Sequence, residues 1–301
     1  MEKIWDGKIA RRSIDGRPAE EPGNVQLVHY CNEDGSDLPV LEFPLLQRTG
    51  IVRHFFTTRL GGVSEGIYSS MNLSWTRGDD PERVKTNFGR AARALGIQPK
   101  DIVLTYQVHG TKVIRVGRED AGKGVTRKRD WNDVDGLVTN EPGLALGTFF
   151  ADCVPIMFVD PVHRAIGSCH SGWRGTAAGI GRAVLEKMHA EFGTDPGDVL
   201  CVVGPSICQQ HYEVSEDVAG VFRDQYKGRE SLVLTPEENG HSLLNLWQAC
   251  RLTLLDAGVL PEHISVTDIC TACNPELLFS HRVSKGQHGN FAGFIVLLPK
   301  N

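Results

Sequence analysis

The sequence lacks the long apolar stretch that a membrane-spanning helix requires. It contains no run of about 18 consecutive apolar residues. The segment Met1–Gly7 also lacks the apolar core of a secretory signal peptide. Eight cysteines in 301 residues are too few for a disulfide scaffold. We therefore expect a cytoplasmic protein with reduced thiols and no membrane partner.

Excess basic charge is missing as well. The formal net charge is −5, whereas nucleic-acid-binding proteins usually carry a strong basic excess. The one basic cluster, Arg127-Lys128-Arg129, is followed closely by Asp130, Asp133 and Asp135. Short clusters of mixed sign are typical of solvated loops. We expect no nucleic-acid partner, and the sequence leaves the oligomeric state open.

The common nucleotide-binding motifs are absent. No G-x-G-x-x-G follows an expected strand, and no G-x-x-x-x-G-K-[ST] occurs. The stretch 172–176 (GWRGT) resembles half of a phosphate loop but lacks its lysine. Expected strands outnumber helices, and few strands are separated by a helix-length crossover. This order favours an α+β fold, a layered α/β sandwich with mixed sheets, over a doubly wound sheet.

The spacing of apolar residues, together with capping residues, Gly and Pro, predicts the individual helices and strands. Residues 1–40 are rich in charge, Gly and Pro, so we expect a peripheral N-terminal arm there and a single catalytic domain over 41–301. A helix is expected over 81–95, with Asp80 as its N-cap and Gly96 after its end. Further helices are expected over 175–192 and 243–257. Strands are expected over 25–30, 51–58, 102–107, 111–116, 134–139, 145–150, 155–159, 165–168, 199–203, 264–267 and 291–298.

Three short stretches carry the most chemistry: 107–110 (QVHG), 151–155 (ADCVP) and 169–176 (CHSGWRGT). They offer His109, Cys153 and His170, each beside small residues. Two imidazoles and one thiol fill three corners of a tetrahedral Zn²⁺ site and leave the fourth for water or substrate. The same trio can instead form a cysteine nucleophile with a histidine base and no metal. Both interpretations predict an enzyme.

Charged residues near these stretches are candidates for supporting roles. Asp152 lies in an otherwise apolar run, where burial without a partner is costly. It is therefore either an acceptor that orients its neighbours or a general acid/base. The turn at 171–172 precedes a helix whose N-terminus favours anions, and Arg174 is placed to bind phosphate there. Arg59 and Arg282 lie in loops and are further candidates for an anionic substrate. For all three arginines the alternative is a surface ion pair.

The pair Cys270-x-x-Cys273 is half of a zinc knuckle or a redox pair. No second C-x-x-C completes a four-cysteine site. We therefore expect a structural role for these two cysteines and disfavour a closed zinc site. The remaining histidines show no H-x-H or H-E-x-x-H spacing, which argues against a multicopper oxidase.

Taken together, the motifs resemble the bacterial laccase-domain family, also called the polyphenol oxidase or peptidoglycan-editing-factor family. The resemblance spans about 41–299. It rests on these stretches: 57–64 (TTRLGGVS), 71–73 (MNL), 107–110 (QVHG), 135–139 (DGLVT), 151–155 (ADCVP), 170–176 (HSGWRGT), 204–207 (GPSI), 270–273 (CTAC) and 279–282 (FSHR). The sequence His288-Gly289-Asn290 departs from the Thr-Gly-Arg of many members.

The resemblance implies a sandwich fold shared with a deamidating toxin of the cytotoxic-necrotizing-factor type. It also implies a metal, usually zinc with copper as the older assignment, on His109, Cys153 and His170. Members are purine nucleoside phosphorylases that also cleave methylthioadenosine, and some deaminate adenosine.

Our leading hypothesis is a zinc-dependent purine nucleoside phosphorylase with an adenosine deaminase side activity, acting on nucleosides and phosphate. The alternatives are a metal-free Cys–His hydrolase or amidase and a role in editing cell-wall precursors. Copper-dependent phenol oxidation ranks last.

Overall fold

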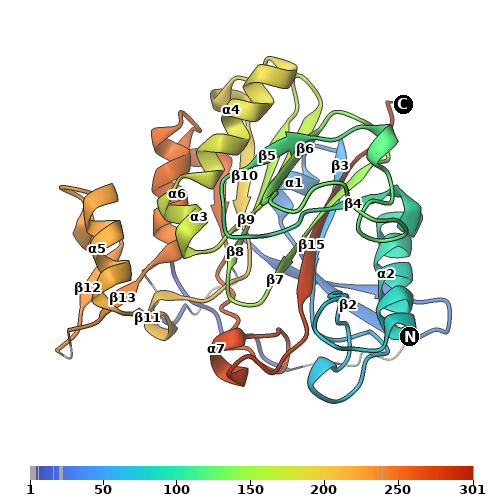
Figure 1. Ribbon diagram of the computed structural model, residues 1–301, viewed down its shortest axis with the longest axis horizontal. Coiled ribbons are helices and arrows are strands. Elements are labelled where there is room, and N and C mark those ends of the chain that lie inside the picture. Colours follow the sequence, from blue (N-terminus) through green and yellow to red (C-terminus); the bar gives the residue numbers. More distant parts are fainter. Residues whose placement is uncertain (1–4, 6, 16, 20–22, 239, 301) are drawn as a thin grey trace.

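The computed structural model describes residues 5, 7–15, 17–19, 23–238 and 240–300 (Figure 1). Two six-stranded mixed sheets form its centre. The first sheet has the order β1-β2-β3-β15-β7-β4, and the second has the order β14-β10-β8-β9-β6-β5. The fold is therefore α+β with several mixed sheets, as the order of elements predicted. The likeness to the deamidating toxin stays a prediction.

Most strand pairs in both sheets are antiparallel, and the parallel pairs lie at the edges. These are β4 with β7 in the first sheet, and β5 with β6 and β10 with β14 in the second. The first sheet contains β1 (Gln26–Cys31), β2 (Asp37–Glu42), β3 (Val52–Thr57), β15 (Phe291–Leu297), β7 (Ala145–Phe150) and β4 (Ile102–Leu104). The second contains β14 (Ile264–Val266), β10 (Leu200–Val203), β8 (Val154–Asp160), β9 (Ala165–Ser171), β6 (Gly136–Thr139) and β5 (Val113–Arg115).

The two sheets pack face to face, and helices cover their outer faces (Figure 1). Strand β8 shows how the layers form, because alternate side chains of a strand point to opposite faces. Met157 and Val159 pack between the sheets, whereas Ile156 and Phe158 pack against the outer helices. The helices on this side are α4 (Ile180–Phe192) and α6 (Leu246–Asp256), and α2 (Pro81–Leu95) covers the first sheet.

Smaller elements complete the fold. A three-stranded sheet of order β11-β13-β12 lies with α5 at one end of the molecule (Figure 1). Within the described residues, no helix is long and apolar enough to cross a membrane. The remaining bounds are β11 (Glu213–Val214), β12 (Leu234–Pro236), β13 (Ser242–Leu244), α1 (Pro44–Gln47), α3 (Trp173–Ala177), α5 (Glu216–Gln225) and α7 (His281–Ser284).

The helix expected over 81–95 is confirmed with both of its caps. The carboxylate of Asp80 accepts the backbone N–H of Glu82 at 2.9 Å. Gly96 has a φ of 75°, which suits the left-handed C-terminal position. The amphipathic pattern and the two caps together determined this element.

Two of the expected helices are wrong in extent. Residues 175–192 do not form one helix, because the chain turns at Gly179 (φ 79°) between α3 and α4. Residues 242–244 form β13 rather than the first turn of a helix, and α6 begins after Asn245, whose side chain accepts the N–H of Gln248 at 3.0 Å.

The N-terminal segment contributes directly to the first sheet. Strand β1 lies at its edge, and β2 crosses residue 40. Arg11 forms an isolated bridge with Ile269, far along the chain. The division into an arm over 1–40 and a catalytic domain over 41–301 stays a prediction about function.

Candidate functional site

A cavity of about 600 Å³ contains the residues that the sequence singled out. His109, Cys153 and His170 all line it, together with Asp152 and Arg282. Their donor atoms, one nitrogen from each histidine and the Cys153 sulfur, all lie within 4.8 Å of one another. The structure therefore brings these three separated residues together.

The trio is placed where the chain passes from one sheet to the other. His109 lies on the connection from β4 to β5, and Cys153 lies on the connection from β7 to β8. His170 is part of β9, which pairs with β8 so that His170 is opposite Pro155. Each of the two crossings includes a residue with positive φ, at His109 (64°) and at Asp152 (83°). Positive φ values are uncommon for residues other than glycine.

Asp135 holds the two histidines in place. Its buried carboxylate accepts the backbone N–H groups of Val108, His109 and Gly110 at 2.9–3.0 Å. It also lies 2.8 Å from Nδ1 of His170. Burial acts to raise the pKa of Asp135, but these hydrogen bonds outweigh burial and keep the pKa below its usual value. A carboxylate on Nδ1 directs Nε2 of His170 toward Cys153, the arrangement typical of metal-binding histidines.

Cys153 and His170 stabilise each other's charged forms. Burial opposes the Cys153 thiolate, but the neighbouring His170 and a contact with His109 lower its pKa to about 6. Burial likewise opposes charge on His170, but the Cys153 thiolate and Asp135 raise its pKa to about 9. Cys153 Sγ lies 3.9 Å from Nε2 of His109. The sulfur is thus ready to act as a thiolate ligand or as a nucleophile.

The trio fits a metal ion. Zinc bonds of about 2.3 Å to sulfur and about 2.0–2.1 Å to nitrogen place the two ligand atoms about 3.6 Å apart. The distance of 3.9 Å between Cys153 and His109 is close to that value. Three protein ligands and an open cavity match the pattern of a catalytic site rather than a closed structural one.

Asp152 lines the cavity with both carboxylate oxygens engaged. One oxygen accepts the hydroxyl of Thr271 at 2.6 Å, and the other accepts the backbone N–H of Arg282 at 2.7 Å. Its own carbonyl accepts the N–H of Ile207 at 3.0 Å. Of the two roles expected for Asp152, these contacts favour an acceptor that positions its neighbours.

The three candidate arginines occupy different places. Arg282 lines the cavity, stacks over Tyr212 at 5.3 Å and donates to the Glu213 carbonyl at 3.1 Å. Arg174 is exposed and stacks on its neighbour Trp173. Arg59 packs over Phe279 and donates to two backbone carbonyls. The substrate roles of Arg59, Arg174 and Arg282 stay predictions, and the position of Arg282 is the most favourable.

Phosphate binding was expected at the N-terminus of the helix after His170, but the structure gives this position little support. The helix that begins after Gly172 is α3, which has only five residues. The Ser171 hydroxyl lies 2.7 Å from the Thr176 hydroxyl and does not cap the helix. A helix this short provides little of the dipole that attracts an anion.

Aromatic side chains also line the cavity. Tyr106, Phe149 and Tyr212 line it, together with Trp75 and Asn290. Among the described residues, the indole Nε1 of Trp75 and the amide oxygen of Asn290 are buried with no hydrogen-bond partner. Buried polar groups are usually paired. These two atoms are exceptions, and they have almost no accessible surface of their own.

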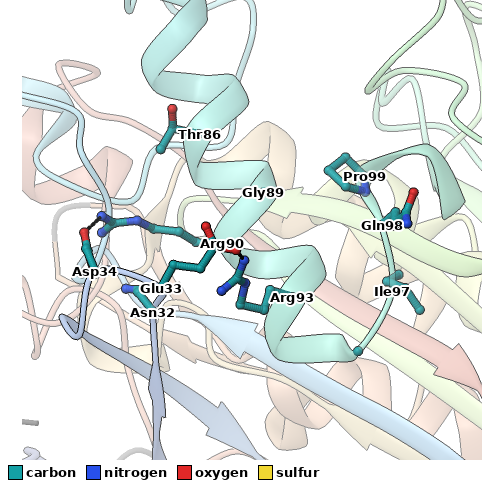
Figure 2. A pocket seen from close by; sticks show the side chains of 11 residues that line it. Asn32, Glu33, Asp34, Thr86, Gly89, Arg90, Arg93, Ile97, Gln98 and Pro99 are labelled. Atoms are coloured by element: carbon teal, nitrogen blue, oxygen red, sulfur yellow. Dashed lines mark hydrogen bonds and ion pairs between the residues drawn. The ribbon is translucent and has the colours of Figure 1, made fainter.

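Another hollow of about 650 Å³ lies beside α2 and has a different character (Figure 2). Its arginines are neutralised by acids, with Arg90 paired to Asp34 and Arg93 paired to Glu33. Figure 2 shows both arginines turned toward these partners. Charge already paired in this way offers little to a ligand, so we place the functional site at the His/Cys/His cavity.

The structure also gathers a second group of sulfur and nitrogen atoms, which the sequence analysis did not anticipate. Cys270 and Cys273 were expected to lack further ligands, but the structure places two beside them. The signal was a second pair with the same spacing, Cys-x-x-His. We call this group the Cys₃His cluster; it consists of Cys208, His211, Cys270 and Cys273.

Known proteins resemble the chain over most of its length. The family model described as multi-copper polyphenol oxidoreductase laccase matches residues 53–298. A protein named purine nucleoside phosphorylase from Deinococcus radiodurans is 38% identical, over 86% of this chain and 93% of its own. Purine nucleoside phosphorylase YlmD from Geobacillus stearothermophilus is 37% identical, over 79% of this chain and 88% of its own.

A solved structure agrees with these sequence matches. The crystal structure of YlmD from Geobacillus stearothermophilus superposes with a TM-score of 0.81 at 33% identity, covering 90% of this chain and 100% of that one. Because the family model and these relatives match most of its length, the chain belongs to the multi-copper polyphenol oxidoreductase laccase family.

Proposed function

We propose that the protein is a metal-dependent purine nucleoside phosphorylase that uses His109, Cys153 and His170. The observation that carries the proposal is the convergence of these three residues in one cavity. A volume of about 600 Å³ lies within the usual range for small-molecule sites. The relatives named purine nucleoside phosphorylase support the reaction class.

The cavity lining suits a purine nucleoside. Aromatic side chains such as Tyr106 and Phe149 offer faces for a planar base. Arg282 supplies positive charge for phosphate within the same cavity.

In phosphorolysis a phosphate oxygen bonds to the anomeric carbon while the carbon–nitrogen bond to the purine breaks. The electron pair leaves with the purine, so the site must stabilise negative charge on the base. A metal at His109, Cys153 and His170 would supply Lewis-acid polarisation of a neighbouring group. Asp152 positions the Arg282 backbone beside Cys153, and Asp135 fixes the orientation of His170.

Zinc is the metal we favour. A set of two imidazoles and one thiolate with a fourth position open is typical of catalytic zinc. A multicopper centre needs more imidazoles than the two that this trio contains. We propose adenosine, inosine and methylthioadenosine as substrates, and deamination of adenosine as a side activity.

A metal-free Cys–His hydrolase is the second candidate. It is favoured by the Cys153–His170 pair, in which the pKa of the thiol falls to about 6 beside an imidazole. The two candidates differ in their need for metal and for phosphate.

Both needs can be tested in one product assay. Purified protein is incubated with adenosine or inosine, with and without phosphate, before and after metal removal. We expect ribose 1-phosphate only with phosphate, loss of turnover on metal removal and recovery with Zn²⁺; ammonia from adenosine would report deamination. The phosphorylase would be refuted if zinc-loaded protein formed neither ribose 1-phosphate from adenosine or inosine nor methylthioribose 1-phosphate from methylthioadenosine. Undiminished turnover without metal would favour the hydrolase.

A further inference from the structure

The Cys₃His cluster joins two segments that are distant in the sequence. Cys208 directly precedes the short 3₁₀ turn after β10 and His211 is its last residue, whereas the other two members lie in the turn after β14. A backbone bridge links Ser206 with Cys270, and Thr271 donates its N–H to the Ser206 carbonyl at 3.1 Å. Backbone pairing therefore places the two halves of the cluster side by side.

The distances within the cluster fit a tetrahedral metal. Nδ1 of His211 lies 3.3 Å from Cys208 Sγ and 3.6 Å from Cys273 Sγ. All four donor atoms lie within 4.8 Å of one another. Ideal zinc bond lengths place sulfur and nitrogen ligands about 3.6 Å apart. We propose that the Cys₃His cluster binds a second metal ion, zinc by preference, as a closed structural site.

The surroundings compensate the charge of such a site. Three thiolates and a neutral imidazole around Zn²⁺ leave one net negative charge. The guanidinium of Arg12 donates from Nε to Cys273 Sγ at 3.2 Å and supplies the opposite charge. The backbone N–H of Cys208 donates to Cys270 Sγ at 3.2 Å. N–H donors to sulfur stabilise thiolates, the form that a metal requires.

The cluster is separate from the His/Cys/His trio but supports the same cavity wall. Thr271, which lies between two members of the cluster, donates its hydroxyl to Asp152 at 2.6 Å. Ile207, directly before Cys208, lines the cavity and donates its N–H to the Asp152 carbonyl. A metal in the cluster would fix the two loops that hold Asp152, the residue before Cys153. It would not contact the substrate.

Metal counting on folded protein tests the proposal independently of activity. Elemental analysis should find about two zinc equivalents in the wild type and about one in Cys153→Ala, which keeps only the Cys₃His cluster intact. Cys273→Ser should also hold about one, with a lower melting temperature. Cys31→Ser, at an exposed cysteine outside both groups, should keep both ions. A Cys153→Ala protein without metal would overturn the proposal.

A second measurement covers the case in which Cys273→Ser fails to fold. Cys153→Ala is loaded with Co²⁺, and its thiolate-to-cobalt absorption is recorded. Three coordinating thiolates should give a strong, tetrahedral spectrum, and alkylation before and after chelation should show three thiols released together. A spectrum without thiolate bands, or a disulfide among the three cysteines in freshly purified protein, would overturn the site.

Discussion

At the scale of single residues, Asp135 connects the two histidines of the site. One carboxylate accepts three backbone N–H groups around His109 and orients His170. Asp135→Asn replaces one carboxylate oxygen with an NH₂ group, which cannot accept a hydrogen bond from these N–H groups. We expect metal affinity of the trio to fall by about 10- to 100-fold, the usual effect of losing such a partner. The affinity is measured by zinc titration of Cys273→Ser and of Cys273→Ser/Asp135→Asn. The Cys273→Ser change removes the proposed second metal site, so only binding at the trio is recorded.

A nearby aspartate provides the matched control for that variant. Asp133 forms an exposed ion pair with Lys112 at 2.8 Å. Asp133→Asn should leave the zinc affinity of the trio unchanged, because exposed ion pairs contribute little. Equal affinities in the Asp133 and Asp135 variants would show that Asp135 does not organise the site.

His54 makes stability depend on pH. It is buried in β3, and Nε2 accepts the backbone N–H of Phe43 at 2.9 Å. Burial lowers the pKa of His54 to about 3. An unfolded histidine titrates near 6.5, so the unfolded chain binds the extra proton between those values and stability is lost as the pH falls. From pH 7 to pH 5 the loss from this group is about 2 kcal/mol.

His54→Gln keeps an acceptor on a side chain of similar length but cannot bind a proton in this range. Urea unfolding at pH 7 and pH 5 should show a smaller acid-induced loss of unfolding free energy in the variant than in the wild type. The same loss in both proteins would mean that His54 is not the titrating group.

The sequence indicated the ligands better than the residues that hold them. His109, Cys153 and His170 stood out because each lies beside small residues in a short motif. Asp135 was noted in the charged loop and in the stretch 135–139 that carries the family resemblance, but it was given no role, although the apolar residues that follow it made an unpartnered acid costly. The Cys₃His cluster was not predicted, because no second C-x-x-C accompanies Cys270 and Cys273, and the pair Cys208-x-x-His211 was not recognised as its partner.

At the scale of elements, the turn from β9 into α3 determines how closely the trio can approach. A Cβ added to Gly172 would lie 2.5 Å from His109 Cδ2 and 3.2 Å from Cys153 Sγ. Gly172→Ala should therefore displace His109 and reduce turnover and zinc binding at the trio by at least about tenfold. Circular dichroism should show an intact fold, because the φ of −69° is compatible with alanine. If Gly172→Ala turned over at the wild-type rate, the close contact of Gly172 with His109 and Cys153 would not matter for activity.

A glycine in α2 offers the contrasting case. A Cβ at Gly89 would meet no atom within 4 Å. Gly89→Ala should raise the unfolding free energy by about 0.5–1 kcal/mol, since alanine favours a helix interior more than glycine does. Denaturant unfolding measures the change, and turnover should stay the same. A destabilised variant would contradict the assignment of this position to an unobstructed helix surface.

Elements with strong local signals were predicted, and elements that depend on distant partners were not. Helix α2 has an amphipathic face and a cap at each end, so it follows from its own residues. Strand β2 was not predicted, because its place between β1 and β3 depends on partners elsewhere in the chain. Residues 243 and 244 were included in the expected helix, but pairing with β11 and β12 makes 242–244 a strand.

At the scale of the whole molecule, the site depends on how the two sheets are connected. His109 and Cys153 lie on separate crossings from the first sheet to the second, and His170 lies in a strand of the second. The packed core between the sheets fixes the two crossings relative to each other. Sequence patterns predicted a layered sandwich but not which connections cross, since that follows from pairing between remote strands.

The central claim is that His109, Cys153 and His170 together perform phosphorolysis. The most direct test measures ribose 1-phosphate formed from inosine and phosphate by zinc-loaded wild type, Cys153→Ala and Cys31→Ser. We predict phosphate-dependent product from the wild type and from Cys31→Ser, and a loss of at least about 10³-fold in Cys153→Ala, because two imidazoles alone hold zinc poorly. Near-normal ribose 1-phosphate formation by Cys153→Ala would contradict the account.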